Sequence, residues 1–259
     1  MRRYINWLIN VTIIVMAVLI AWPVFAADLQ TKVPYYAAPV PVSAVPYTWT
    51  GLYVGLNGGA GFGMDTATAT SISGGSASFN LPLASQPTSG WLGGATVGYN
   101  WQSGPIVLGV EGEFDWTSLS GSTACLTYFS CSAKQSWLGD IAARVGVVTP
   151  GMPLMLFVKG GVAWSDFSYA FGNTLFGTTV AANASDTRTG ALIGMGAEYA
   201  FAQNWSAKVE YDFIDFGTST EAFPLAVSSC QGCTLPTVNA AIRDTESLMK
   251  IGVNYRFNF

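Results

Sequence analysis

The side chains with the greatest capacity for chemistry in this chain are its carboxylates, and three of them form a ladder: Glu111, Glu113 and Asp115. Carboxylates at every second position would share one face of a strand, where they could form a weak cation site. Ion pairing with lysine and arginine across an enclosed space explains the same ladder equally well. The sequence contains no histidine, which excludes Ser-His-Asp and Cys-His catalysis and makes zinc or histidine-ligated haem improbable.

Cysteine and glycine motifs give no further catalytic signal. The four cysteines form two local pairs, Cys125 with Cys131 and Cys230 with Cys233, and in an exported chain these are most simply disulfides that pin loops. The second pair has the spacing of a redox motif but lacks the βαβ context of one. The glycine-rich stretch over residues 58–63 is not followed by a helical pattern, so it is not a phosphate-binding loop. We therefore expect no enzyme activity, no metal site and no cofactor.

The N-terminus has the features of a secretory signal peptide. Arg2 and Arg3 precede an apolar run over residues 5–21, and Val-Phe-Ala26 provides a small residue for cleavage, so residues 1–26 are the predicted signal peptide. An uncleaved anchor helix is the alternative. Removal of the two arginines leaves nine basic residues against fifteen acidic ones, with no basic cluster, so nucleic acid is not an expected partner. Residues 27–48 contain four prolines and predict a periplasmic spacer.

The elements that must position the charged residues are strands. From Ser247 to Phe259, apolar residues alternate with residues that are polar or small except for Leu248, which predicts a strand long enough to cross a bilayer at a tilt. Beyond the N-terminal run, no apolar stretch approaches the roughly 20 residues that a membrane helix needs. Seven other segments alternate in the same way: Thr50–Phe62, Trp91–Trp101, Ile106–Trp116, Trp137–Val148, Leu154–Phe167, Arg188–Phe201 and Trp205–Phe216. The sequence thus predicts an all-β fold: an eight-stranded antiparallel up-and-down transmembrane β-barrel over residues 49–259.

Connection lengths and tryptophan positions support this prediction. Short turns are expected at residues 102–105, 149–153 and 202–204, and long loops at residues 63–90, 117–136, 168–187 and 217–245. Outer-membrane barrels have short periplasmic turns and long outer loops, and an even strand count places both termini in the periplasm. Tryptophans are expected on the outer surface near both ends of the strands, which predicts two aromatic girdles: Trp91, Trp116, Trp137 and Trp164 at one end, Trp101 and Trp205 at the other.

On this register, most of the charged residues face the lumen. The predicted lumen network comprises Glu111, Glu113, Asp115, Asp140, Arg144, Lys159, Arg188, Glu198, Lys208, Glu210, Asp212, Lys250 and Arg256. The network could be a plug of ion pairs or a path for ions and water. Because an eight-stranded barrel is only wide enough for its interior side chains, the plug is favoured.

Several strand sequences resemble a known family. Trp49-Thr-Gly-Leu-Tyr-Val-Gly-Leu-Asn-Gly-Gly, Val110-Glu-Gly-Glu-Phe-Asp, Val209-Glu-Tyr-Asp-Phe and the Tyr255-Arg-Phe ending are similar to small porin-family, OmpA-like surface proteins of alphaproteobacteria, of the Brucella and rhizobial major outer-membrane protein type. The resemblance implies an eight-stranded barrel in the outer membrane of a Gram-negative envelope, with a role in envelope integrity. Some members are reported to bind haem, but no haem-binding segment can be transferred to this chain.

Three functions are therefore considered. The first is a non-enzymatic structural surface protein, in contact with outer-membrane lipid and inserted by the barrel assembly machinery through an aromatic signal at Tyr255, Phe257 and Phe259. The second is a narrow passive diffusion pore for small solutes or ions. The third is binding of a surface ligand such as haem, or of a host partner, by the two cysteine-containing loops.

Overall fold

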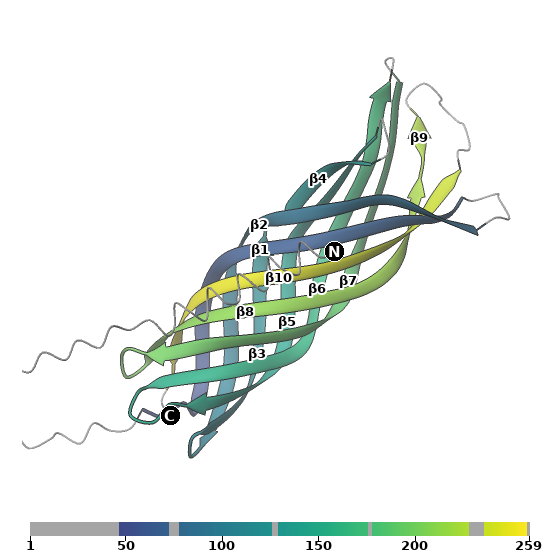
Figure 1. Ribbon diagram of the computed structural model, residues 1–259. Coiled ribbons are helices and arrows are strands. Elements are labelled where there is room, and N and C mark those ends of the chain that lie inside the picture. Colours follow the sequence, from purple (N-terminus) through teal and green to yellow (C-terminus); the bar gives the residue numbers. More distant parts are fainter. Residues whose placement is uncertain (1–46, 73–77, 126–128, 176–177, 228–235, 258–259) are drawn as a thin grey trace, which may run out of the picture. The chain divides into compact units, whose positions relative to one another are not determined.

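The computed structural model describes residues 47–72, 78–125, 129–175, 178–227 and 236–257, which form a ten-stranded antiparallel sheet (Figure 1). Eight of these strands are long: β1 (Gly51–Ile72), β2 (Ser78–Ser103), β3 (Ile106–Thr117), β5 (Phe129–Val148), β6 (Leu154–Leu175), β7 (Thr178–Ala200), β8 (Trp205–Pro224) and β10 (Thr237–Arg256). Two are short: β4 (Ser120–Cys125) and β9 (Ala226–Val227). The predicted signal peptide, and all of the predicted spacer except residues 47 and 48, lie outside the described residues.

The eight long strands close into a ring. Each pairs with its neighbour in this series, and β1 also pairs with β10, so that Val54 faces Val97 of β2 on one side and Tyr255 of β10 on the other. Closure leaves no long strand with an unpaired edge along its membrane-crossing part. Among the described residues, no helix is long and apolar enough to cross a membrane. The predicted eight-stranded antiparallel barrel is confirmed.

Side-chain alternation gives the barrel an apolar outside and a charged inside. In β8, Val209 is 58% exposed while its neighbour Lys208 is 1% exposed, and the same alternation runs along the strand from Trp205 to Ile214. A strand places successive side chains on opposite faces, so residues of one parity cover the outer surface and residues of the other fill the interior. The apolar residues therefore lie where lipid would contact them.

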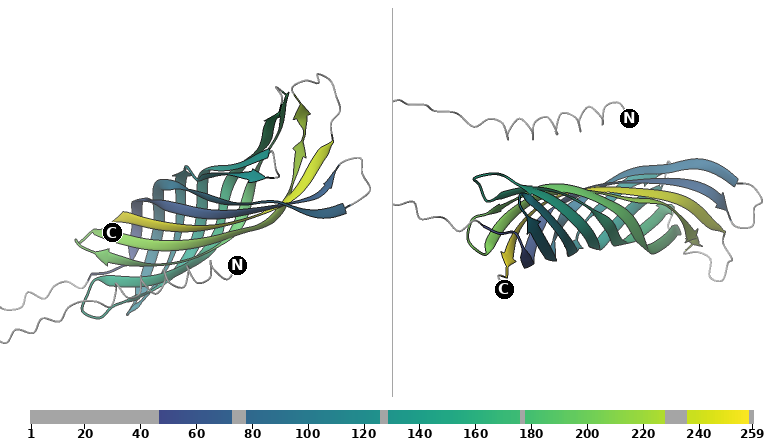
Figure 2. Two further views of the ribbon diagram at one scale, coloured as in Figure 1. Left: turned by 45° about the horizontal axis from the view of Figure 1, so that its top comes forward. Right: turned by 90° about the horizontal axis from the view of Figure 1, so that it is seen from below.

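The prediction of four long loops is wrong in one respect: most of the residues expected in loops extend the strands. β1 extends to Ile72 and β2 begins at Ser78, while β6 extends to Leu175 and β7 begins at Thr178, so paired strands project beyond the ring as hairpins (Figure 2). The prediction followed apolar alternation, which marks only the lipid-facing part of a strand. Backbone hydrogen bonds between strands need no apolar side chains, so serine-, threonine- and alanine-rich segments extend the ladder.

The opposite end of the barrel has short turns at the predicted places. β2 ends at Ser103 and β3 begins at Ile106, with Gly104 at a φ of 59°. Gly151, at a φ of 78°, occupies the corresponding turn between β5 and β6. Both values lie in the left-handed region that glycine enters without steric cost. The two ends are called the short-turn end and the long-hairpin end below.

Candidate functional site

The structure places all thirteen residues of the predicted lumen network inside the barrel. Each of them is at most 5% exposed. They come from β3, β5, β6, β7, β8 and β10, strands distributed around the ring, so their side chains meet across the interior. Charged groups in such an enclosed space require partners, which makes their pairing the central feature of the site.

Lys250 and Lys159 form the centre of the network. Lys250 Nζ lies 3.0 Å from Glu210 Oε1 and 2.6 Å from Asp212 Oδ2, and it also pairs with Glu113. Lys159 Nζ lies 2.7 Å from Glu210 Oε1 and 3.2 Å from Asp212 Oδ2. Two ammonium groups therefore share the same two carboxylates, which spreads the charge over one connected cluster.

Lys208 connects this centre to the carboxylate ladder. Its Nζ lies 3.1 Å from Glu113 Oε2 and 3.3 Å from Glu210 Oε2. Lys159 reaches Glu111 as well, at 3.3 Å. Two members of the ladder are thus neutralised by lysines from other strands, as the ion-pairing interpretation requires.

Arg144 extends the network towards the short-turn end. Its guanidinium donates to Glu111 Oε2 at 3.2 Å and to Glu198 Oε2 at 2.7 Å. The same group lies over the rings of Tyr53 and Phe157, 5.2 and 4.8 Å from their centroids. Ring contacts of this kind stabilise a cation that has lost its water.

Three of the buried carboxylates could in principle hold a metal ion. Oxygen atoms of Glu113, Glu210 and Asp212 lie within 4.8 Å of one another. Lys250 pairs with all three, so its ammonium group already supplies the positive charge that a cation would bring. This arrangement favours an ion-pair cluster over a metal centre.

Asp115 and Asp140 are buried nearby, and neither belongs to an ion pair within the described part of the chain.

An aromatic cap closes the short-turn end. The ring of Trp49 is 0% exposed, and the guanidinium of Arg256 lies 4.8 Å from its centroid and 4.6 Å from that of Tyr47. The Trp49 backbone N–H donates to Gln102 Oε1 at 2.7 Å. Sequence reasoning treated Trp49 only as the start of the barrel. Its parity with Tyr53, which faces inward, was the signal that could have placed it inside.

A second polar cluster lies at the long-hairpin end. Arg188 pairs with Asp244 and donates to the Ile242 carbonyl at 2.8 Å, while the Tyr169 hydroxyl donates to Asp244 Oδ2 at 2.7 Å. Asp244 was not predicted because residues 217–245 were expected to form a loop. Tyr169 lies beyond the tryptophan girdle, and its pKa is raised chiefly because the hydroxyl is buried.

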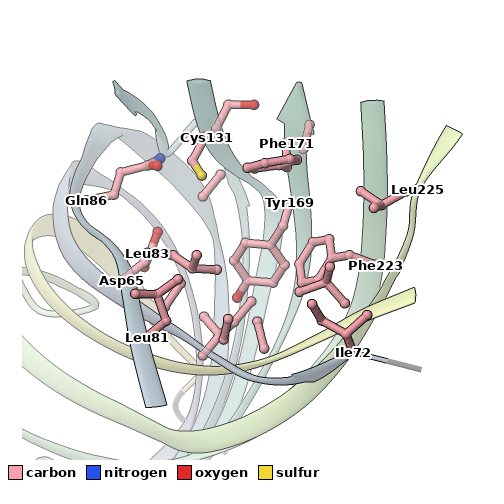
Figure 3. Close-up of a pocket in the computed structure, with 18 residues that line it drawn as sticks. Asp65, Ile72, Leu81, Leu83, Gln86, Cys131, Tyr169, Phe171, Phe223 and Leu225 are labelled. Atoms are coloured by element: carbon pink, nitrogen blue, oxygen red, sulfur yellow. The ribbon is translucent and has the colours of Figure 1, made fainter. Parts of the chain in front are cut away.

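Above this cluster, the mouth of the barrel contains a mostly apolar, partly open cavity of about 250 Å³ (Figure 3). Strands β1, β2, β5, β6, β8 and β10 all contribute to its wall, with Leu83, Phe171 and Phe223 among the apolar side chains. Asp65 and Gln86 bring polar groups to one side of it. The sequence did not predict this cavity, because it lies within the expected loops.

The remaining predicted residues are the C-terminal aromatic residues and the four cysteines. Tyr255 contacts Trp205 and Phe257 edge to face, with ring centroids 5.0 and 5.1 Å away, in the girdle of the short-turn end. Phe259 lies outside the described residues. Cys131 is disulfide-bonded. The side chains of Cys125, Cys230 and Cys233 are not among those described, so the pairing of the four cysteines stays a prediction.

The closed ring, its apolar outer surface and its charged interior agree with comparisons to known proteins. Residues 35–257 match the model of the outer membrane protein beta-barrel domain family. The chain belongs to this family. The resemblance found in the strand sequences is thereby confirmed, and the protein is an outer-membrane β-barrel.

Individual relatives point the same way. The 31 kDa outer-membrane immunogenic protein of Brucella melitensis is 31% identical over 78% of this chain and 85% of its own length. The 25 kDa outer-membrane immunogenic protein of Brucella abortus is 29% identical over 90% of both chains. The 22 kDa outer membrane protein of Rhizobium leguminosarum is 28% identical over 50% of this chain and 54% of its own.

Solved structures that match this chain have much lower sequence identity. The outer membrane protease OmpT of Escherichia coli covers 83% of this chain and 99% of its own, with 11% identity and a TM-score of 0.48. The outer membrane protein OprG of Pseudomonas aeruginosa covers 80% of this chain and 97% of its own, with 9% identity and a TM-score of 0.45.

Proposed function

We propose that the protein is a non-enzymatic, non-conducting structural component of the outer membrane that presents its long hairpins at the cell surface. In this proposal, the short-turn end and both termini are periplasmic. The family match supports a location in the outer membrane, and the usual arrangement of such barrels, with short turns inside, supports the orientation. The closed lumen is the observation that carries the proposal.

The absence of free space around the central charges argues against conduction. The side chains of Lys159, Lys250 and Glu210 are 0% exposed, so no water-sized space adjoins them. An ion crossing the lumen would have to separate lysines from carboxylates that have no water to replace the lost contacts. At the short-turn end, Trp49 and Tyr47 cover the exit from this network. A narrow pore would require the central ion pairs to separate and the rings of Trp49 and Tyr47 to move away from the exit.

Planar-bilayer recording tests this proposal. The mature chain, shown to be folded by its heat-modifiable migration on gels, is expected to give no steady conductance steps. Glu113→Ala and Phe114→Ala form a matched pair, because Glu113 faces the lumen and Phe114 the lipid. Steady steps that change with Glu113→Ala and not with Phe114→Ala would establish a pore and refute the proposal.

The orientation requires a separate test. An epitope inserted in the connection between β6 and β7 should bind antibody on intact cells. The same epitope inserted at Gly151, in a short turn, should bind only after the outer membrane is permeabilised. The opposite pattern would reverse the proposed orientation.

We further propose that the barrel assembly machinery inserts the chain through its C-terminal aromatic residues. The aromatic side chains of Tyr255 and Phe257 contact each other at the end of the last strand, which supports this proposal. Deletion of Phe259 should reduce the amount of heat-modifiable barrel in the outer-membrane fraction several-fold, whereas Phe201→Ala, at an aromatic residue of the same rim, should not. An unchanged yield after the deletion would contradict this role.

A further inference from the structure

The cavity at the long-hairpin end is not used by the proposed structural function. Strand β2 runs from the long-hairpin end to the short-turn end. Gln86 on the cavity wall precedes the girdle residue Trp91 by five residues, so the cavity lies on the long-hairpin side of the tryptophan girdle. Its volume is about 250 Å³. For comparison, an engineered cavity of about 150 Å³ lined by apolar side chains stays dry and binds benzene. The cavity in this barrel is therefore large enough for an apolar body of roughly ten carbon atoms.

Two buried polar side chains interrupt the apolar wall. Asp65 of β1 and Gln86 of β2 are ladder partners, so they project from adjacent strands into the same interior space. Figure 3 shows both on one side of the cavity, with Tyr169 across from them. Asp65 is 7% exposed and Gln86 is 4% exposed, and neither Asp65 Oδ2 nor Gln86 Nε2 has a hydrogen-bond partner among the residues that the structure describes. A buried polar atom without a partner carries the full cost of its lost hydration, so both atoms favour a ligand that completes them.

We propose that this cavity binds a small neutral amphipathic molecule that consists of an apolar body of about ten carbon atoms and one hydroxyl group. The hydroxyl donates its hydrogen to Asp65 Oδ2 and accepts one from Gln86 Nε2, so a single group satisfies both atoms. A carboxylate ligand would be repelled by Asp65. An ammonium ligand would leave the Gln86 N–H without an acceptor, because it can only donate.

The apolar part of the ligand has matching surroundings. Leu83, Phe171 and Phe223 line the cavity from three different strands, and Ala240 of β10 lines it as well. Burial of an apolar body against these side chains supplies the affinity, and the polar pair supplies selectivity for the hydroxyl. The inference does not rest on a closed lumen, because the cavity walls belong to the hairpins beyond the central ion pairs.

Equilibrium dialysis of the mature chain in lipid nanodiscs tests the proposal, with protein-free nanodiscs to correct for partition into lipid. The probes are 2-naphthol and naphthalene, which share a ten-carbon body and differ by the hydroxyl. At pH 8, above the pKa of about 7 to which burial raises Asp65, the carboxylate is ionised. One 2-naphthol should bind per chain, at least about tenfold more tightly than naphthalene, as expected for a hydrogen bond to a charged group.

Variants separate this site from the lipid-facing surface. Asp65→Leu should weaken 2-naphthol binding about tenfold and leave naphthalene binding unchanged. Ala240→Phe should fill the cavity and abolish binding of both probes, whereas Ala95→Phe, on the lipid-facing surface, should change neither. Equal affinity for the two probes, or full binding by folded Ala240→Phe protein, would overturn the proposal. If Ala240→Phe does not fold, the ratio of the two affinities in Asp65→Leu decides the question.

Discussion

Replacement of Arg144 by methionine should destabilise the barrel, because Glu198 would lose its ion-pair partner. Arg144 is 1% exposed and pairs with both Glu111 and Glu198. Glu111 keeps Lys159 at 3.3 Å after the change. Among the described residues, the hydrogen-bond donors that Glu198 keeps are neutral: the Ser206 hydroxyl at 2.6 Å and the Asn254 amide at 2.9 Å.

The expected loss follows from this difference. Removing one partner of a buried ion pair typically costs about 3–5 kcal/mol, because an uncompensated charge stays buried. The cost should therefore arise at Glu198 and not at Glu111. Adding Glu198→Gln to Arg144→Met removes that charge and should recover at least about 2 kcal/mol, because an apolar or neutral replacement of a whole pair is often close to neutral.

Urea titration of the protein folded in phospholipid vesicles measures these differences, with tryptophan fluorescence as the signal. Val145→Met is the matched control, because Val145 is the next residue of β5 and faces lipid, and it should change the free energy of unfolding by less than about 1 kcal/mol. The reasoning would be refuted if the double variant Arg144→Met, Glu198→Gln lost as much free energy of unfolding as the two single variants added together. An effect of Arg144→Met no larger than that of the control would also refute it.

Three further outcomes are expected. Val145→Lys places a charge in lipid and should cost about 2–4 kcal/mol in the same titration, and a harmless substitution would mean that the faces of β5 are misassigned. Burial, and then the charge of Glu246, raise the pKa of Asp65 to about 7 against the opposing effect of Arg188. Because this pKa is higher than in the unfolded chain, the Asp65 carboxyl lowers the free energy of unfolding as pH rises from about 4 to about 7, so Asp65→Asn should make the pH dependence of stability less steep over that range; equal pH slopes would contradict the assignment. Trp49→Ala removes a fully buried ring from the cap and should cost about 3–5 kcal/mol, and an unchanged urea midpoint would show that the cap is not part of the folded barrel.

Sequence alone determined the membrane-crossing part of the fold. The alternation in segments such as Trp205–Phe216 identified the long strands and their two faces, because lipid outside and charge inside require opposite residue types at successive positions. The same alternation placed Lys208, Glu210 and Asp212 in the interior, where the structure has them. The lumen residues could be predicted because the face on which a side chain lies depends only on whether its position in the strand is odd or even.

Tertiary structure decided what those residues do together. Parity placed Arg144 in the lumen, but its partners Glu111 and Glu198 come from two other strands, and their distances depend on the tilt and register of the whole ring. The hairpins beyond the membrane were expected as loops, because their serine- and threonine-rich segments carry no lipid-facing pattern. Closure of the ring brings Asp65 and Gln86 together with side chains far apart in the chain, such as Phe223 and Ala240. A cavity depends on such long-range packing, and no local pattern in the sequence encodes it.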